Sequence, residues 1–118
     1  MCYNNNVERE VHKMKGVLTL KTPLDGVAFN IGQIVLTQGV HNMVQEDDKF
    51  ADFVGDSFKR HCQCDWGDLC REDKEMNENA LRNGERLFSK YNFNDKVSIY
   101  IITEWDGSAT TILFPNEY

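Results

Sequence analysis

The C-terminal third of the chain carries the strongest constraint on its fold, a hairpin signal between two apolar runs. Asp106-Gly107 separates Val97–Trp105 from Ser108–Phe114, and both runs are rich in β-branched or aromatic residues. An Asp-Gly pair between two such runs is the strongest short hairpin signal that a sequence can carry. Pro115 cannot donate a backbone hydrogen bond and ends the second strand. We therefore expect an antiparallel hairpin over these residues.

The length of the hairpin loop determines which residues face each other. With a two-residue loop, Thr103 faces Thr110 and Glu104 faces Ala109, while Thr111 lies diagonal to Glu104. Paired hydroxyl groups suit an antiparallel sheet and need no further explanation. If the hairpin packs near a helix, Glu104 can also close a polar cluster there. Glu104, Thr110 and Thr111 are therefore candidate site residues.

Further strands are expected on both sides of a central helical region. Arg86–Tyr91 predicts a strand that the turn at Phe93-Asn94-Asp95 joins to the hairpin, which completes a three-stranded antiparallel meander. Nearer the N-terminus, Val17–Lys21, Val27–Asn30 and Gln33–Thr37 are candidates for one or two further strands. The last of these is the richest in β-branched and apolar residues.

Three helices are expected between these strand regions. Val40–Gln45 predicts a short helix, and Phe50–His61 a longer one that the preceding Asp47-Asp48 pair can cap. The third begins at Arg71-Glu72 and ends at Asn83-Gly84, a suitable C-cap. The predicted fold class is α+β, with about three helices followed by a three-stranded antiparallel meander and one or two further N-terminal strands.

Length and composition indicate one small globular domain. The chain has 118 residues, of which 41% are hydrophobic, enough for a single core. We expect a polar N-terminal tail or short helix over residues 1–15 and a single globular α+β domain over residues 16–118. No apolar run approaches the roughly 18 residues of a membrane span. The N-terminus also lacks the apolar stretch of a secretory signal, so we expect a cytoplasmic protein away from membranes.

The third predicted helix has two polar residues where its apolar face should continue. At about 100° per residue, Leu69, Met76 and Ala80 share one face, and Asp73 and Asn77 fall inside the same sector. Burying a carboxylate or an amide without a partner costs about 1–3 kcal/mol. The pair therefore indicates either a polar knot that ties the helix to its neighbours or a binding site.

The segment before this helix, Asp65-Trp66-Gly67-Asp68, has two interpretations. In the first, it is a tight turn anchored by a buried indole, and either aspartate caps the next helix. In the second, it is a loop that presents its first aspartate and its tryptophan beside Asp73 and Asn77. The structural interpretation already explains most of these residues.

His61 lies on the apolar side of the second predicted helix. An imidazole near a carboxylate is suited to acid–base catalysis, and a small hydrolase-like enzyme would use His61 with Asp65, Asp73 and Glu104. A histidine on an apolar face is more often a hydrogen-bonded core residue. No nucleophile motif such as Gly-x-Ser-x-Gly accompanies it.

A metal site is a weaker hypothesis. His61, Cys62, Cys64 and Cys70 are the ligand types of a Cys3His zinc site. The spacing is poor, because Cys62 and Cys64 are only one residue apart. Small reduced thiols near a helix junction are the simpler interpretation, and we expect no cofactor.

The formal net charge of −6 bears on partners. A nucleic-acid-binding protein normally carries a basic patch or stripe, so we expect no direct nucleic-acid binding. The acidic residues are denser over residues 46–56 and 65–78, and such a surface either attracts a basic protein or keeps the protein soluble. Small size, acidity and the missing nucleophile motif favour protein binding over catalysis.

Three blocks of residues resemble a known pattern when taken together. They are His61-x3-Asp65-Trp66-Gly67-Asp68-Leu69-Cys70-x-Glu72-Asp73-x3-Asn77-x2-Ala80-Leu81, Gly84-x-Arg86-Leu87-x-Ser89-x-Tyr91 and Ile101-Ile102-Thr103-Glu104-x-Asp106-x-Ser108-x-Thr110-Thr111-Ile112-Leu113-Phe114-Pro115-x-Glu117-Tyr118. Over roughly residues 31–118 the chain resembles a family of small plasmid-related bacterial proteins of plasmids, phages and other mobile elements. The resemblance implies an accessory protein that binds another protein, with inhibition of a host defence system as the role. It implies no mechanism.

Overall fold

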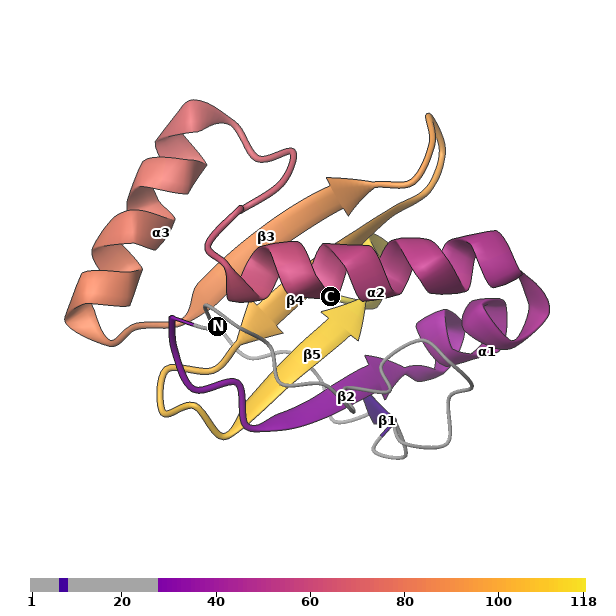
Figure 1. The fold of residues 1–118 in the computed structure, drawn as a ribbon, viewed down its shortest axis with the longest axis horizontal. Coiled ribbons are helices and arrows are strands. Elements are labelled where there is room, and N and C mark those ends of the chain that lie inside the picture. The colour runs from indigo at the N-terminus through magenta and orange to yellow at the C-terminus, as the bar shows by residue number, and fades with distance from the viewer. Residues whose placement is uncertain (1–6, 9–27) are drawn as a thin grey trace.

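A mixed β-sheet, with helices against one face and along one edge, forms the described part of the chain (Figure 1). The structure is a computed structural model, and it describes residues 7–8 and 28–118. The strands are β1 (Val7–Glu8), β2 (Gln33–Thr37), β3 (Leu87–Asn92), β4 (Ser98–Thr103) and β5 (Ala109–Leu113), in the order β1-β2-β5-β4-β3. The helices are α1 (Gln38–Glu46), α2 (Asp48–Cys62), α3 (Arg71–Asn83) and the short 3-10 helix η2 (Pro115–Glu117).

The α+β class is confirmed, but the sheet is not a pure antiparallel meander. β3, β4 and β5 are antiparallel as predicted, whereas β2 pairs with β5 in parallel. The chain leaves β2 through three helices and re-enters the sheet at the opposite edge, at β3. A helical crossover of this kind allows the next strand to run parallel to the first. The meander then returns across the sheet and places β5 beside β2.

The predicted register of the hairpin is confirmed, and its loop is longer than predicted. Thr103 pairs with Thr110, and the Glu104 N–H donates to the Ala109 carbonyl at 3.0 Å. A tight turn then forms within the loop, because the Gly107 N–H donates to the Glu104 carbonyl at 2.9 Å. Gly107 has a φ of +70°, which glycine adopts without strain. The loop between the two strands therefore spans residues 104–108.

The N-terminal predictions meet the structure in part. The strand at Gln33–Thr37 is confirmed as β2, whereas residues 28–30 form no strand. The candidate strand at Val17–Lys21 lies outside the described residues. Within the segment expected to be a tail, Val7–Glu8 pairs antiparallel with β2.

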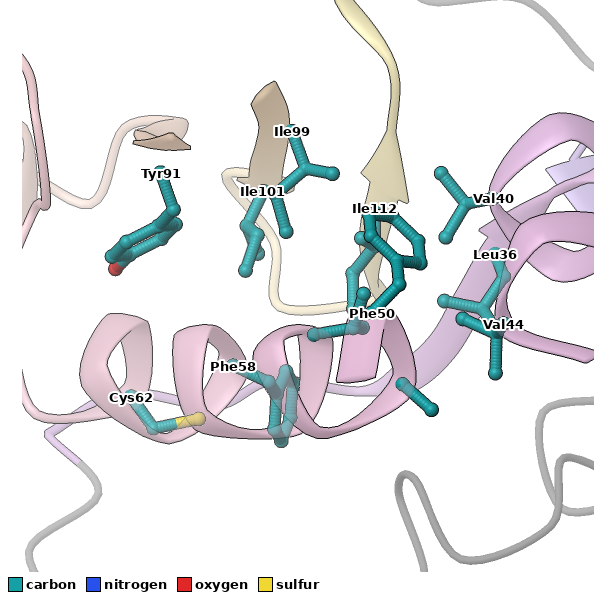
Figure 2. Close-up of a cluster of buried hydrophobic side chains, with 12 residues drawn as sticks. Leu36, Val40, Val44, Phe50, Phe58, Cys62, Tyr91, Ile99, Ile101 and Ile112 are labelled. Atoms are coloured by element: carbon teal, nitrogen blue, oxygen red, sulfur yellow. The ribbon is translucent and has the colours of Figure 1, made fainter. Parts of the chain in front are cut away.

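The main hydrophobic core lies between α1, α2 and one face of the sheet (Figure 2). As predicted, Phe50, Val54 and Phe58 form the buried side of α2. The helix starts at Asp48 because the Asp47 carboxylate caps it. This carboxylate accepts hydrogen bonds from the Lys49 N–H at 2.9 Å and from the Phe50 N–H at 3.1 Å. The remaining members of this core come from α1, α2 and the strands: Leu36, Val40, Val44, Ala51, Cys62, Tyr91, Ile99, Ile101 and Ile112.

The C-terminal end of the described chain is joined to the start of α1. The Glu117 carboxylate accepts hydrogen bonds from the Thr37 hydroxyl at 2.5 Å and from the Gly39 N–H at 3.1 Å. A carboxylate at a helix N-terminus satisfies a backbone donor and complements the helix dipole. Within the described ranges, none of the helices has the length and apolarity of a membrane span.

Candidate functional site

A chain of buried hydrogen bonds runs from α2 across three strands. His61 is fully buried, and its Nδ1 lies 2.6 Å from the Ser89 hydroxyl of β3, while its Nε2 lies 2.9 Å from the Thr103 hydroxyl of β4. Thr103 in turn contacts the Thr110 hydroxyl at 2.7 Å. Thr110 donates to the Ile31 carbonyl at 2.8 Å. The sequence candidates His61 and Thr110 thus belong to one network.

The direction of each hydrogen bond in this network follows from its final acceptor. The Ile31 carbonyl can only accept, so it takes the single proton of Thr110. Thr103 must then donate to Thr110, and His61 Nε2–H must donate to Thr103. Burial lowers the pKa of His61 from the ordinary value of 6.5 to about 3, so the ring is neutral in the folded protein. Because Nε2 carries the proton of the neutral ring, Nδ1 accepts a hydrogen bond from the Ser89 hydroxyl.

Ser89 and His61 form a serine–histidine pair without access to a substrate. A hydroxyl hydrogen-bonded to an imidazole is the geometry of an activated nucleophile. Here, however, Ser89 and His61 are both fully buried, and the second ring nitrogen is bonded to a threonine hydroxyl where a catalytic histidine would meet a carboxylate. Ser89 was missed in the sequence. It lies between Leu87 and Tyr91 on the inward face of β3, and that alternation was the available signal.

The buried neutral histidine makes the free energy of unfolding depend on pH. Because the pKa of His61 is about 3 in the folded protein and near 6.5 in the unfolded chain, only the unfolded chain binds a proton between these values. The contribution of the neutral His61 to the free energy of unfolding is therefore greatest above pH 6.5, and it decreases as the pH falls below that value. We expect a loss of about 2 kcal/mol between pH 7 and pH 5. Urea titrations at both pH values should show this difference in wild type and not in His61→Gln.

Asn77 closes one position of the open edge of β3. Its side-chain oxygen accepts from the Phe88 N–H at 3.1 Å, and its side-chain nitrogen donates to the Phe88 carbonyl. The amide thus takes the place of a neighbouring strand at this residue. An uncovered edge strand leaves backbone groups unpaired and invites association with other chains. The inward position of Asn77, predicted from the helix periodicity, is confirmed by its burial.

The Asp-Trp-Gly-Asp segment covers the rest of the same edge. The Asp68 N–H donates to the Lys90 carbonyl at 2.6 Å, and the Lys90 N–H donates to the Trp66 carbonyl at 3.4 Å. The Asp68 carboxylate accepts from the Asn92 N–H at 2.9 Å. Alternate residues of β3 are thus paired outside the sheet, by Asn77 or by this segment. We call Asn77 and the segment Asp65–Asp68 together the edge cover, because they pair with the backbone of β3 at Phe88, Lys90 and Asn92.

The two aspartates of this segment do not cap α3. Asp65 accepts from the Gly67 N–H at 3.1 Å and pairs with Arg60 at 2.9 Å, while Asp68 is bonded to β3. The N-cap residue of α3 is Cys70, which makes no side-chain cap. The Arg60 guanidinium holds the pKa of the Asp65 carboxyl below its ordinary value. The predicted capping role was therefore wrong, because both carboxylates are engaged within the turn and by β3.

Trp66 is the buried anchor of this turn, as the structural interpretation proposed. Its indole N–H donates to the Glu78 carboxylate at 2.7 Å. Its ring stacks on Phe29 with centroids 6.4 Å apart and meets the His61 ring edge-on at 5.7 Å. The indole thus connects α3, the residues before β2 and the buried histidine.

Two expectations for α3 were wrong. Asp73 is exposed, and Met76, expected on the apolar face, is 67% exposed. The buried residues of α3 are Asn77 and Ala80. The helix lies beside the edge strand β3 (Figure 1), so it buries a narrow stripe of residues instead of a broad face. A narrow stripe leaves the margins of the predicted apolar sector in solvent.

The remaining candidates do not converge. His61 is sealed in the core, Asp65 pairs with Arg60 at the surface, Asp73 is exposed on α3, and Glu104 lines a cleft beside the hairpin. Thr111 is buried, and its hydroxyl has no hydrogen-bond partner among the described residues. The four residues of the hydrolase hypothesis are therefore not gathered around one pocket.

The cysteines and His61 do not assemble a metal centre either. Across residues 28–118 and 7–8, no cluster of three histidine, cysteine or acidic residues is placed to hold an ion. Both ring nitrogens of His61 are bonded to hydroxyls. Burial raises the pKa of the Cys62 thiol to about 12, which opposes the thiolate form that zinc needs. Cys64 is half-buried and Cys70 is exposed.

An aromatic groove lies between α3 and the sheet. It has a volume of about 430 Å³. Phe88, Tyr100 and Tyr118 form its aromatic wall, with ring centroids 4.6–6.2 Å apart. Arg86 donates to the Tyr118 hydroxyl at 2.8 Å. The other lining residues are Leu69, Asp73, Met76, Asn77, Ala80 and Glu85.

A smaller cleft of about 180 Å³ lies between the hairpin loop and the C-terminal end of α3. Glu85, Glu104 and Trp105 line it together with Phe29, and the Trp105 side chain is 70% exposed. Glu85 also lines the aromatic groove, so the two hollows share one rim. Sequence reasoning assigned Trp105 to a strand and missed this position. Its place next to the Asp-Gly turn was the available signal.

The three large apolar residues exposed among those described all border these hollows. They are Met76, Trp105 and Tyr118, which are 67%, 70% and 41% exposed. We define the Trp105–Tyr118 surface as these three residues together with Glu85 and Arg86, which lie on the rims between them. Comparisons with protein families, with curated proteins and with solved structures found no match to this chain.

Proposed function

We propose that this protein acts by binding another protein through the Trp105–Tyr118 surface. The observation that carries the proposal is the gathering of Met76, Trp105 and Tyr118 around Glu85 and Arg86. Tryptophan, tyrosine, methionine and arginine are enriched at protein interfaces, and tryptophan, tyrosine and arginine dominate their binding energy. Large apolar side chains that share one exposed region mark such a site.

The biological setting of the proposal rests on the resemblance described above. It makes this protein a small acidic accessory protein of a mobile genetic element, and the partner a host protein, with inhibition of a defence system as the consequence. The net charge of −6 favours a partner with a basic surface, because opposite charges accelerate encounter and select among partners. The proposal locates the protein in the cytoplasm, where such targets act.

A binding role suits the surface better than a catalytic one. The grooves offer aromatic rings and a few charged groups, whereas the histidine and the serine that could perform chemistry are fully buried. The residues of the edge cover are engaged in holding β3. Binding needs only the exposed side chains that are present, on a scaffold that the buried network holds rigid.

Trp105→Ala should weaken binding to the partner by at least about tenfold, since truncating a central interface tryptophan costs 1–4 kcal/mol. The partner is first captured from a bacterial lysate on immobilised wild-type protein, and is then purified and titrated by calorimetry. Asp95→Ala serves as the matched control, because Asp95 is exposed in the loop between β3 and β4.

Two results would contradict the proposed function. One is that no lysate protein is retained more strongly by wild type than by Trp105→Ala. The other is that the purified partner binds wild type, Trp105→Ala and Asp95→Ala with equal affinity. Circular dichroism and melting of the variants accompany both measurements, because a folded Trp105→Ala is required for either comparison.

A further inference from the structure

The small cleft beside Trp105 has the size of a single side chain. Its volume is about 180 Å³, below the roughly 300–1,000 Å³ of pockets for drug-sized ligands. The hairpin loop forms one wall, the end of α3 forms another, and Phe29-Asn30 closes the third. The cleft opens within the Trp105–Tyr118 surface, so a group that enters it comes from a partner docked there.

All charged residues that line this cleft are acidic: Glu85, Glu104 and Asp106. Asp106 accepts from the Ser108 N–H at 3.0 Å and is engaged in the loop. Glu104 differs from Asp106, because it is half-buried and its Oε2 has no hydrogen-bond partner among the described residues. A half-buried carboxylate with an unpaired oxygen is stabilised by a charged donor that approaches its carboxyl group. The three acidic side chains therefore favour a cation that carries N–H groups.

Two further features of the cleft favour a cation. The C-cap residue of α3, Gly84, lies on the wall of the cleft, and a helix C-terminus carries partial negative charge. The exposed indole of Trp105 offers an aromatic face, and tryptophan is the best aromatic partner for a lysine or arginine head group. The carboxylates, the helix end and the indole thus favour the same kind of group.

We infer that the partner inserts one lysine or arginine side chain into this cleft, with its head group on Glu104 and its stem along Trp105. The inference rests on the proposed function and names the partner's anchoring residue. A guanidinium supplies several donors in a planar fork, which suits a carboxylate beside an aromatic ring. Charge complementarity with an acidic protein selects this occupant over an apolar one.

The inference is tested with a probe that carries only the side chain. Nα-acetyl-arginine amide is titrated into the ¹⁵N-labelled protein at about 0.15 M salt, and the Trp105 indole N–H and the Gly107 amide are followed by NMR. We expect saturable shifts with a dissociation constant in the millimolar range, typical of a single anchored side chain. Glu104→Gln should weaken binding at least fivefold, and Glu72→Gln, an exposed carboxylate on α3, should not.

Nα-acetyl-citrulline amide, the neutral counterpart of the probe, separates charge recognition from apolar contact. Equal shifts with citrulline, unchanged affinity in Glu104→Gln, or saturation by calcium chloride with no response to arginine would each overturn the inference. These outcomes differ from failure of the proposed function. A partner that depends on Trp105 while arginine does not bind removes only the inference, whereas a partner indifferent to Trp105 removes the proposed function.

Discussion

His61→Ala is expected to lower the free energy of unfolding by about 3–5 kcal/mol, the largest effect of any single substitution proposed for this chain. The substitution opens a cavity among fully buried residues. It also leaves the Ser89 and Thr103 hydroxyls without their shared partner, at about 1–3 kcal/mol for each unpaired group. Urea denaturation followed by fluorescence measures the change.

The control for this substitution is Asp52→Ala, on the exposed side of the same helix, which should change stability by less than about 0.5 kcal/mol. If His61→Ala does not fold, His61→Gln supplies the measurement. An amide keeps one donor and one acceptor, so a smaller loss of about 1–2 kcal/mol is expected. If the free energy of unfolding of the histidine variant lies within about 0.5 kcal/mol of the wild-type value, the buried chain of hydrogen bonds does not stabilise the fold.

Asn77→Ala is expected to lower the free energy of unfolding by about 2–3 kcal/mol, because it uncovers the edge of β3. The substitution removes both hydrogen bonds to the Phe88 backbone and leaves a donor and an acceptor partly buried and unpaired. The Phe88 amide should then exchange with solvent faster than in wild type, because its partner is gone. Native-state hydrogen exchange at this single amide measures the local effect separately from global stability.

Asp73→Ala is the matched control, one turn earlier on the same helix. From the sequence, a loss of 1–3 kcal/mol is expected for Asp73 as a buried group. Its exposed position predicts less than about 0.5 kcal/mol instead. Equal losses for the two variants would contradict the assignment of the edge cover to Asn77.

Local signals in the sequence predicted the elements, and the long-range arrangement lay beyond them. The hairpin register could be read from Asp106-Gly107, because a short loop sets cross-strand pairs over a few residues. The buried side of α2 and the cap at Asp47 also depend only on residues that are close in sequence. The parallel pairing of β2 with β5 depends instead on where the three helices return the chain to the sheet.

In the candidate site, too, the features set by neighbouring residues were predictable and the long-range contacts were not. Helix periodicity predicted that Asn77 is buried. It does not indicate that α3 lies along a strand edge, so Asp73 and Met76 were also expected to be buried. Ser89 was missed because its partner His61 lies on another element. The exposure of Trp105 and Tyr118 depends on which surfaces the helices leave uncovered, and no local pattern carries that information.

The polar Asp-Trp-Gly-Asp block builds the scaffold, and we propose that the Trp105–Tyr118 surface binds the partner protein. The most direct test is the affinity of the captured partner for Trp105→Ala and for Asp65→Ala, measured side by side by calorimetry. Asp65 is exposed in the edge cover, and its side chain bonds to Arg60 and to the Gly67 N–H. We expect at least about tenfold weaker binding for Trp105→Ala and unchanged binding for Asp65→Ala. Binding that is lost with Asp65→Ala and kept with Trp105→Ala would contradict it.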